Sequence, residues 1–241
     1  MPGIGIGIGT RTRSGKPPFS PASLSGLVFQ TSKSGSFFTD AGVTSAAIGQ
    51  RVGRWVATVG GNLNQTQVAA PDNRLVRASW GLVPPASPNG NECLTFAPVV
   101  LSGDFTLYMV RQFHAGGTFE MLKGSGSGRI VDFAASLLYV VDDAGVTTRA
   151  VGADFSNTTP KWVRVRRSGT TIFAASDGVA EVALTNFTVA LGTITLSQLG
   201  GNTYSLTDAT DGWGATLIYD SNLSAGNRTL VEAWLAANEY P

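Results

Sequence analysis

The strongest constraint on the fold of this 241-residue chain is a long succession of short β-rich segments. Turn sequences that contain Gly and Asp separate them, as at Asp142–Gly145 and Ser176–Gly178. Short strands with frequent turn signals predict an all-β sandwich or barrel. The predicted strands are Arg51–Val59, Phe105–Gln112, Thr118–Lys123, Arg129–Phe133, Leu137–Val141, Trp162–Arg167, Ile172–Ala175, Glu181–Leu184, Ile194–Leu199 and Gly214–Tyr219.

The clearest alternation of apolar and polar residues lies in Trp162–Arg166. Here apolar side chains fall on one face of a strand and Arg164 and Arg166 on the other, which is typical of a half-exposed antiparallel strand. The C-terminus instead has helical periodicity, with Ser224 as a candidate N-cap. The helix is predicted to place four apolar residues on one side: Leu230, Val231, Trp234 and Leu235. We therefore predict an antiparallel two-sheet sandwich over residues 22–241, with a short C-terminal helix.

Residues 1–21 differ from the rest and predict an extended N-terminal arm. Ile4, Ile6 and Ile8 alternate with Gly, and a basic segment with Arg11 and Arg13 follows. In an extended conformation the three isoleucines share one face, so the arm could add a strand to the sheet of a neighbouring molecule. A disordered tail is the alternative, because termini are often untethered.

The composition argues against several partners. Charged residues make up 14% of the chain, against the usual ~25%, and the net charge is +1. There is no global field to attract nucleic acid or an anionic membrane, so neither is predicted as a partner. No segment reads as a signal peptide or a membrane helix. Cys93 is the single cysteine and is predicted to be buried, and without a Cys/His cluster no metal or cofactor is predicted.

The sequence also lacks the patterns of common catalytic sites. Glycoside hydrolysis requires two carboxylates that flank the scissile bond, but the acidic residues are scattered, and the pair Asp142–Asp143 falls in a predicted turn. His114 is the only histidine, and no Gly-x-Ser-x-Gly elbow presents a nucleophile. The prediction at this point is that the chain is not an enzyme, with a degenerate glycoside hydrolase as the remote alternative.

Aromatic residues offer candidate sugar contacts, because a Trp or Tyr ring can stack on a hexose while Asp side chains bond its hydroxyls. For any single ring, a place in the core is the competing interpretation. The candidate glycan contacts are Trp80, Tyr204, Asp208, Asp211 and Trp213.

Three stretches together resemble the concanavalin A-like lectin/glucanase superfamily, and specifically laminin-G-like domains of bacteriophage and prophage structural proteins. They are Gly53–Trp55 with Gly60–Gln67 and Asn73–Val76; Lys161–Gly169 with Ser176–Gly178; and Ala215–Asp220 with Leu223–Ser224 and Leu230–Ala237. The resemblance implies a jelly-roll fold. It further implies a virion structural protein, such as a capsid decoration, head-fibre or tail-appendage subunit.

The leading hypothesis is thus a homo-oligomeric virion subunit, assembled in a bacterial host, whose N-terminal arm binds other capsid or tail proteins. The alternative hypothesis is a carbohydrate-binding module that adheres to host or environmental glycans.

Overall fold

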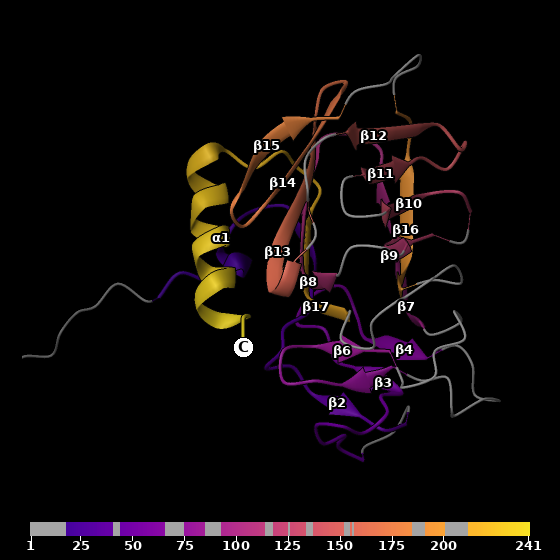
Figure 1. Cartoon of the computed structure of the whole chain (residues 1–241), viewed down its shortest axis with the longest axis vertical. Helices are drawn as coiled ribbons and strands as arrows, with labels where there is room; N and C mark the ends of the chain where they lie inside the picture. The colour runs from indigo at the N-terminus through magenta and orange to yellow at the C-terminus, as the bar shows by residue number, and fades with distance from the viewer. Residues whose placement is uncertain are drawn as a thin grey trace, which may run out of the picture.

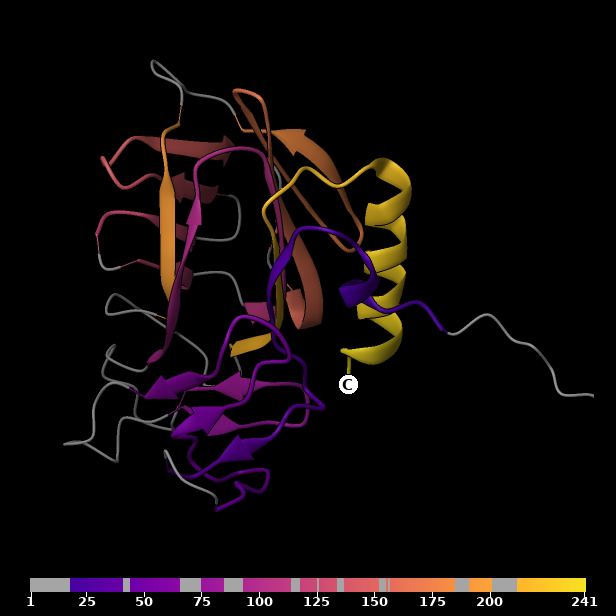
Figure 2. The ribbon, with the colours of Figure 1, turned by 180° about the vertical axis from the view of Figure 1, so that it is seen from behind.

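The fold consists of two antiparallel β-sheets that face each other, with one helix on the outside (Figures 1 and 2). It was obtained as a computed structural model, and the prediction of a two-sheet sandwich with a short C-terminal helix is confirmed. The structure describes residues 18–40, 44–65, 75–84, 93–113, 118–124, 126–133, 137–151, 155, 157–184, 191–200 and 212–241.

The first sheet contains eight strands: β1 (Leu27–Gln30), β5 (Val76–Arg77), β6 (Leu82–Val83), β8 (Phe105–Phe113), β13 (Asn157–Ser168), β14 (Thr171–Ser176), β15 (Val179–Ala183) and β17 (Gly212–Tyr219). Their order is β15-β14-β13-β8-β17-β6-β5, and β1 also pairs with β17. The central strands β8 and β17 are buried along their whole length, because both faces of this sheet are covered.

The second sheet contains nine strands: β2 (Phe37–Phe38), β3 (Arg54–Trp55), β4 (Leu63–Gln65), β7 (Cys93–Leu101), β9 (Thr118–Lys123), β10 (Arg129–Phe133), β11 (Leu137–Val141), β12 (Thr147–Val151) and β16 (Ile194–Gly200). Their order is β12-β11-β10-β9-β16-β7-β4-β3-β2. Strand β16 therefore lies between β7 and β9, which precede it in the chain by many residues.

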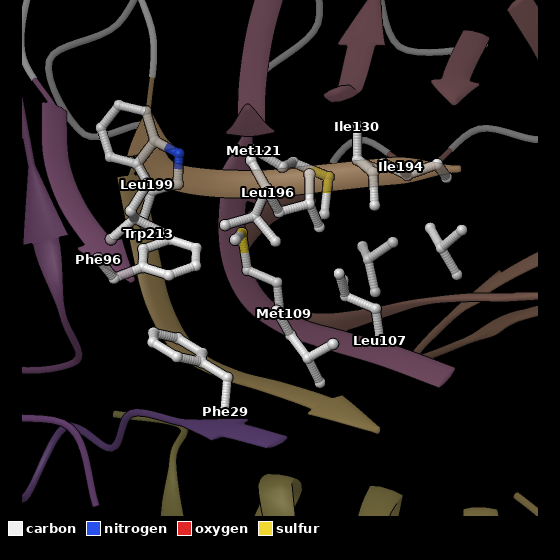
Figure 3. Close-up of a cluster of buried hydrophobic side chains, with 14 of the residues drawn as sticks. Phe29, Phe96, Leu107, Met109, Met121, Ile130, Ile194, Leu196, Leu199 and Trp213 are labelled. Atoms are coloured by element: carbon white, nitrogen blue, oxygen red, sulfur yellow. The ribbon is translucent and has the colours of Figure 1, made fainter. Parts of the chain in front are cut away.

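The main hydrophobic core lies between the two sheets. Leu107 and Met109 of β8 face Met121, Leu196 and other apolar side chains of the second sheet (Figure 3). The intervening residues of β8, Tyr108 and Val110, point to the opposite side of the first sheet. Because side chains alternate along this strand, its residues belong in turn to two separate hydrophobic clusters.

The second cluster packs under α1 (Ala225–Asn238), which covers the outer face of the first sheet (Figure 1). The Ser224 side chain caps this helix by accepting a hydrogen bond from Asn227 N at 3.3 Å. Val231 and Leu235 are fully buried, whereas Leu230 is 47% exposed. The predicted apolar side of the helix is therefore only partly in contact with the sheet.

Helix α1 also changes the environment of the arginine face of β13. Arg164 and Arg166 were predicted to face solvent, but they are only 7% and 8% exposed. The prediction failed because carboxylates from α1 and β15 cover this face and neutralise its arginines. The residue pattern of β13 alone does not show that these two elements pack against it.

The packed region begins before residue 22. Phe19 packs against the second cluster, Pro21 is buried in a short 3-10 turn (Pro21–Ser23), and the Tyr219 hydroxyl donates to Pro21 O at 3.3 Å. The boundary predicted after residue 21 thus falls inside the packed part of the chain. Ile4, Ile6, Ile8, Arg11 and Arg13 lie outside the described residues.

Candidate functional site

The outer faces of the two sheets differ in cover. Helix α1 and the apolar cluster beneath it occupy the outer face of the first sheet. Among the described segments, no helix lies on the outer face of the second sheet (Figure 2). This second face is therefore the larger candidate binding surface, and we call it the open face.

A continuous row of residues crosses the open face from β4 to β12. Register pairs each residue with the next: Asn64 with Thr95, Thr95 with Gln198, Gln198 with Lys123, and Lys123 with Arg129. Arg129 then pairs with Val141, and Val141 with Thr147. Neighbouring residues of the same strands, including Leu94, Leu122 and Ile130, are buried in the main core. Alternation therefore directs the row outward.

The row is mostly polar and accessible. Asn64, Arg129 and Thr147 are exposed, Thr95, Gln198 and Lys123 are partly exposed, and only Val141 is buried. With strands ~4.8 Å apart, the seven strands give a row roughly 29 Å long. Its amide, hydroxyl, ammonium and guanidinium groups can donate to and accept from a polar ligand that lies across the strands.

An aromatic ring flanks this row. Tyr139 of β11 lies between Leu138 and Val140, which are both in the main core, so Tyr139 is on the open face and is partly exposed. It lies two residues before Val141 on the same strand. A tyrosine next to polar groups provides a surface on which a sugar ring can stack.

The two carboxylates of the β11–β12 turn are occupied by protein donors. Asp142 accepts from Val146 N and Gly192 N, each at 2.7 Å. Asp143 accepts from Thr195 N at 2.9 Å and from Thr195 Oγ1 at 2.7 Å. These bonds tie the β11–β12 turn to the start of β16 and the residues just before it. In the described part of the chain, no group of three or more His, Cys, Asp or Glu residues is placed to hold a metal ion.

A cluster of ion pairs lies under α1, on the other side of the molecule. Glu181 binds Arg164 at 2.6 Å and Arg166 at 2.5 Å, and Glu232 of α1 binds Arg164 as well. The hydrogen bond from Arg166 lowers the pKa of Glu181 to about 2. Burial raises the pKa of Glu232 and that of Tyr108, whose hydroxyl donates to Glu232 at 3.3 Å. Because each carboxylate already has a guanidinium partner, this cluster attaches the helix to the sheet.

Two predicted glycan contacts are buried. Trp213 is fully buried between the sheets (Figure 3), and Trp80 is 6% exposed in the cluster under α1. The two rings therefore lie on opposite faces of the first sheet and cannot form one sugar platform. The prediction for Trp213 is wrong because β17 begins at Gly212, two residues earlier than expected, and a register shift between Trp213 and Thr216 turns the Trp213 side chain toward the main core.

The other predicted residues are not brought into a site. Tyr204, Asp208 and Asp211, together with His114, lie outside the described residues. Cys93 was predicted to be buried, but it is partly exposed at the start of β7.

Sequence reasoning missed the residues of the open face. Lys123 and Arg129 were placed at the ends of predicted strands, and Gln198 inside one, yet none was a candidate for binding. The alternation Leu138-Tyr139-Val140 was a signal that Tyr139 faces away from the core. The row itself depends on the pairing of distant strands, which no local pattern reports.

The fold defines the class of the protein: an antiparallel two-sheet β-sandwich domain with one polar outer face. No protein-family model matches the sequence, and no curated protein matches it. Solved structures do match the fold.

A chain of the Trypanosoma rangeli sialidase in complex with 2,3-difluoro-KDN is 16% identical, with a TM-score of 0.52. The match covers 89% of this chain and 33% of the sialidase chain, so this chain spans about a third of that protein's length. CG-16, a homodimeric agglutinin from chicken liver, is 11% identical with a TM-score of 0.32, covering 51% of this chain and 99% of the agglutinin. The receptor-binding domain of botulinum neurotoxin type G is 8% identical with a TM-score of 0.43, covering 88% of this chain and 52% of that domain.

The sialidase match corrects the prediction that the chain is not an enzyme. That prediction rested on the absence of common catalytic patterns from the sequence, but a similar sandwich forms part of a sialidase chain. At 16% identity the likeness shows the fold alone. Separately, none of the described helices is long and apolar enough to cross a membrane.

Proposed function

We propose that this protein is a carbohydrate-binding domain that holds an oligosaccharide across the open face of the second sheet. The observation that carries the proposal is the row from Asn64 to Arg129, in which five adjacent strands each present a polar side chain on the same face. Sugar hydroxyls bond to such fixed amide, hydroxyl and cationic groups, and Tyr139 adds a ring for stacking.

The shape of the face supports an extended ligand. The whole row, from β4 to β12, crosses seven strands and is roughly 29 Å long, given a strand spacing of ~4.8 Å. An enclosed pocket would select a single small molecule, whereas a row of this kind can contact successive sugar units of a chain. Sheet hydrogen bonds hold the backbone of the row in place, so little conformational entropy is lost from the protein on binding.

A glycan array with the full chain, followed by isothermal titration calorimetry of the best ligand, tests the proposal. Gln198→Ala removes a central amide of the row and is expected to weaken binding about tenfold, as a hydrogen bond lost from a binding site does. Asn238→Ala is the matched control, because it removes an exposed amide from α1 on the opposite layer. Absence of binding at millimolar ligand, or equal losses in both variants, would contradict the proposal.

We propose as a second candidate function a subunit of a bacteriophage virion, joined to capsid or tail proteins through its N-terminal arm. The supporting observation is the fixed base of the arm: Phe19 and Pro21 are packed onto the sandwich beside α1. An open groove of about 410 Å³ lies there, lined by residues that include Leu230 and Trp234. An arm that starts from a fixed base leaves the sandwich free for display.

Substituting Ile4, Ile6 and Ile8 together by Ser in the full chain tests this second function. The variant is expected to keep its thermal transition, because the base of the arm is unchanged, but to lose self-association and incorporation into particles. Light scattering after size-exclusion chromatography measures the oligomeric state. An unchanged oligomer and unchanged incorporation would refute a role for the arm.

A further inference from the structure

Lys123 and Arg129 form a pair of cations on the open face. The two residues are directly opposite each other on β9 and β10, which brings their Cβ atoms to about 5 Å. Next to them along the chain are Gly124 and Gly128, which are joined by a hydrogen bond of 2.8 Å from Gly124 N to Gly128 O. The position of the pair is thus fixed by both the register and this bond.

The two glycines are needed for this arrangement. A Cβ atom at Gly124 would overlap Thr195 O of β16, and one at Gly128 would overlap Asp143 Oδ1. Both glycines therefore lie directly against β16 or the β11–β12 turn. These contacts hold the cation pair on a rigid part of the sheet.

The pair is not neutralised by the described part of the protein. The ion pairs there involve Arg164 and Arg166 of the first sheet, and none involves Lys123 or Arg129. The carboxylate in the adjoining turn, Asp143, binds Thr195 and forms no ion pair with either cation. Two opposed like charges repel, and an anion between them would remove that repulsion.

From this geometry we infer that the open face selects acidic saccharides, with a sugar carboxylate held between Lys123 and Arg129. The inference rests on the proposed carbohydrate-binding function of the same face. Arg129 can take a carboxylate with two parallel N–H bonds, and Lys123 adds a point charge from the neighbouring strand. Gln198 and Thr95, which continue the row, provide neutral groups for the hydroxyls of the adjoining sugar units.

Calorimetry with an oligogalacturonate pentamer and its fully methyl-esterified form tests the inference on the full chain. Esterification removes the charge but keeps the hydroxyls, so the free acid is expected to bind at least about tenfold more tightly. Lys123→Gln and Arg129→Gln are each expected to weaken binding of the acid about 5- to 20-fold, since each removes a charged hydrogen-bond partner. Arg228→Gln, on α1, is the matched control and should bind as the parent does.

The same comparison is repeated with sialyllactose and lactose, which places the carboxylate on a different sugar. Tighter binding of either acidic ligand, lost in the two variants, supports the inference. Equal binding of acidic and neutral partners would overturn it while leaving the carbohydrate-binding function in place. No binding of any of the four saccharides would remove both. Duplex DNA that competes at similar affinity would overturn it in favour of a general anion site.

Discussion

The ion-pair cluster under α1 leads to a prediction about pH and stability. In the variant Glu181→Gln, the protein loses the carboxylate that binds Arg166 at 2.5 Å and 2.8 Å and Arg164 at 2.6 Å. The hydrogen bond from Arg166 lowers the pKa of Glu181 from its ordinary value of 4.5 to about 2. Glu181 therefore stabilises the folded state at pH values above 4.5, and this contribution is lost as the pH falls from 4.5 to 2.

The magnitude follows from that difference in pKa. Since one pKa unit corresponds to about 1.4 kcal/mol, a fall from 4.5 to about 2 gives an upper limit of ~3.5 kcal/mol. The Glu181 side chain is 25% exposed, so solvent screens part of this energy and we expect a loss of about 2 kcal/mol at pH 7. Arg164 keeps Glu232 as a partner in the variant, which limits the cost of leaving charge buried.

Urea denaturation of the parent and the variant at pH 7, 5, 4, 3 and 2 measures the effect. The difference in unfolding free energy should be about 2 kcal/mol at pH 7 and should shrink below pH 4.5. Buried Glu239, whose pKa is raised and whose partners are Ser32 and Lys33, titrates in both proteins and cancels in this comparison. Asp220→Asn, an exposed carboxylate after β17, is the control and should match the parent throughout.

A difference that stays constant down to pH 2 would refute this reasoning, because it would show that the substituted amide disturbs packing and not charge. A difference near zero at pH 7 would refute it too, since the cluster would then contribute nothing to the attachment of α1.

Three further predictions concern single substitutions, each measured by urea denaturation with circular dichroism. Trp213→Ala, at a fully buried position, should lower the free energy of unfolding by about 3–5 kcal/mol, and this loss should be seen with no saccharide present. Leu235→Ala should lower the free energy of unfolding by about 2–5 kcal/mol, because it leaves a cavity between α1 and the first sheet. A smaller loss would mean that the helix is not packed there. Lys123→Gln should leave the stability unchanged or raise it by about 0.2–1 kcal/mol, because it removes repulsion from Arg129; a clear loss would contradict the cation pair.

Short β-rich runs were sufficient to predict several strands to the residue. Thr118–Lys123, Arg129–Phe133 and Leu137–Val141 begin and end where the sequence placed them. These three strands follow one another as neighbours in the second sheet, so local turns fix their pairing. The C-terminal helix was predictable for the same reason, because its cap and periodicity are local.

Segments that pair with distant parts of the chain were predicted less well. Arg51–Val59 was expected as one strand, but only Arg54–Trp55 is a strand. The remaining residues bond to several different segments, as Val52 N to Leu75 O and Thr58 N to Gln30 O show. The nine residues of Cys93–Leu101 were missed, since Pro98 lies near a register shift and interrupts the pattern.

The candidate site depended on the same distant pairing. Gln198 joins Thr95 to Lys123 only because β16 inserts between β7 and β9. No property of Gln198 within its own strand distinguishes it from an ordinary surface amide. Trp213 failed as a candidate because it lies on β17, a central strand of the first sheet whose two faces are both covered, so its ring is buried whichever face it joins.

The two outer faces show that the role of a charged side chain depends on whether another element packs over it. On the first sheet, Arg164 and Arg166 are buried because α1 and β15 bring Glu232 and Glu181 to neutralise them. On the second sheet, Lys123 and Arg129 are directly opposite each other, but no described carboxylate is paired with them. A layer packed onto that face would have to supply an anion or bury two like charges, which is costly. The open face is therefore expected to remain in contact with solvent until an anionic group supplies the missing charge.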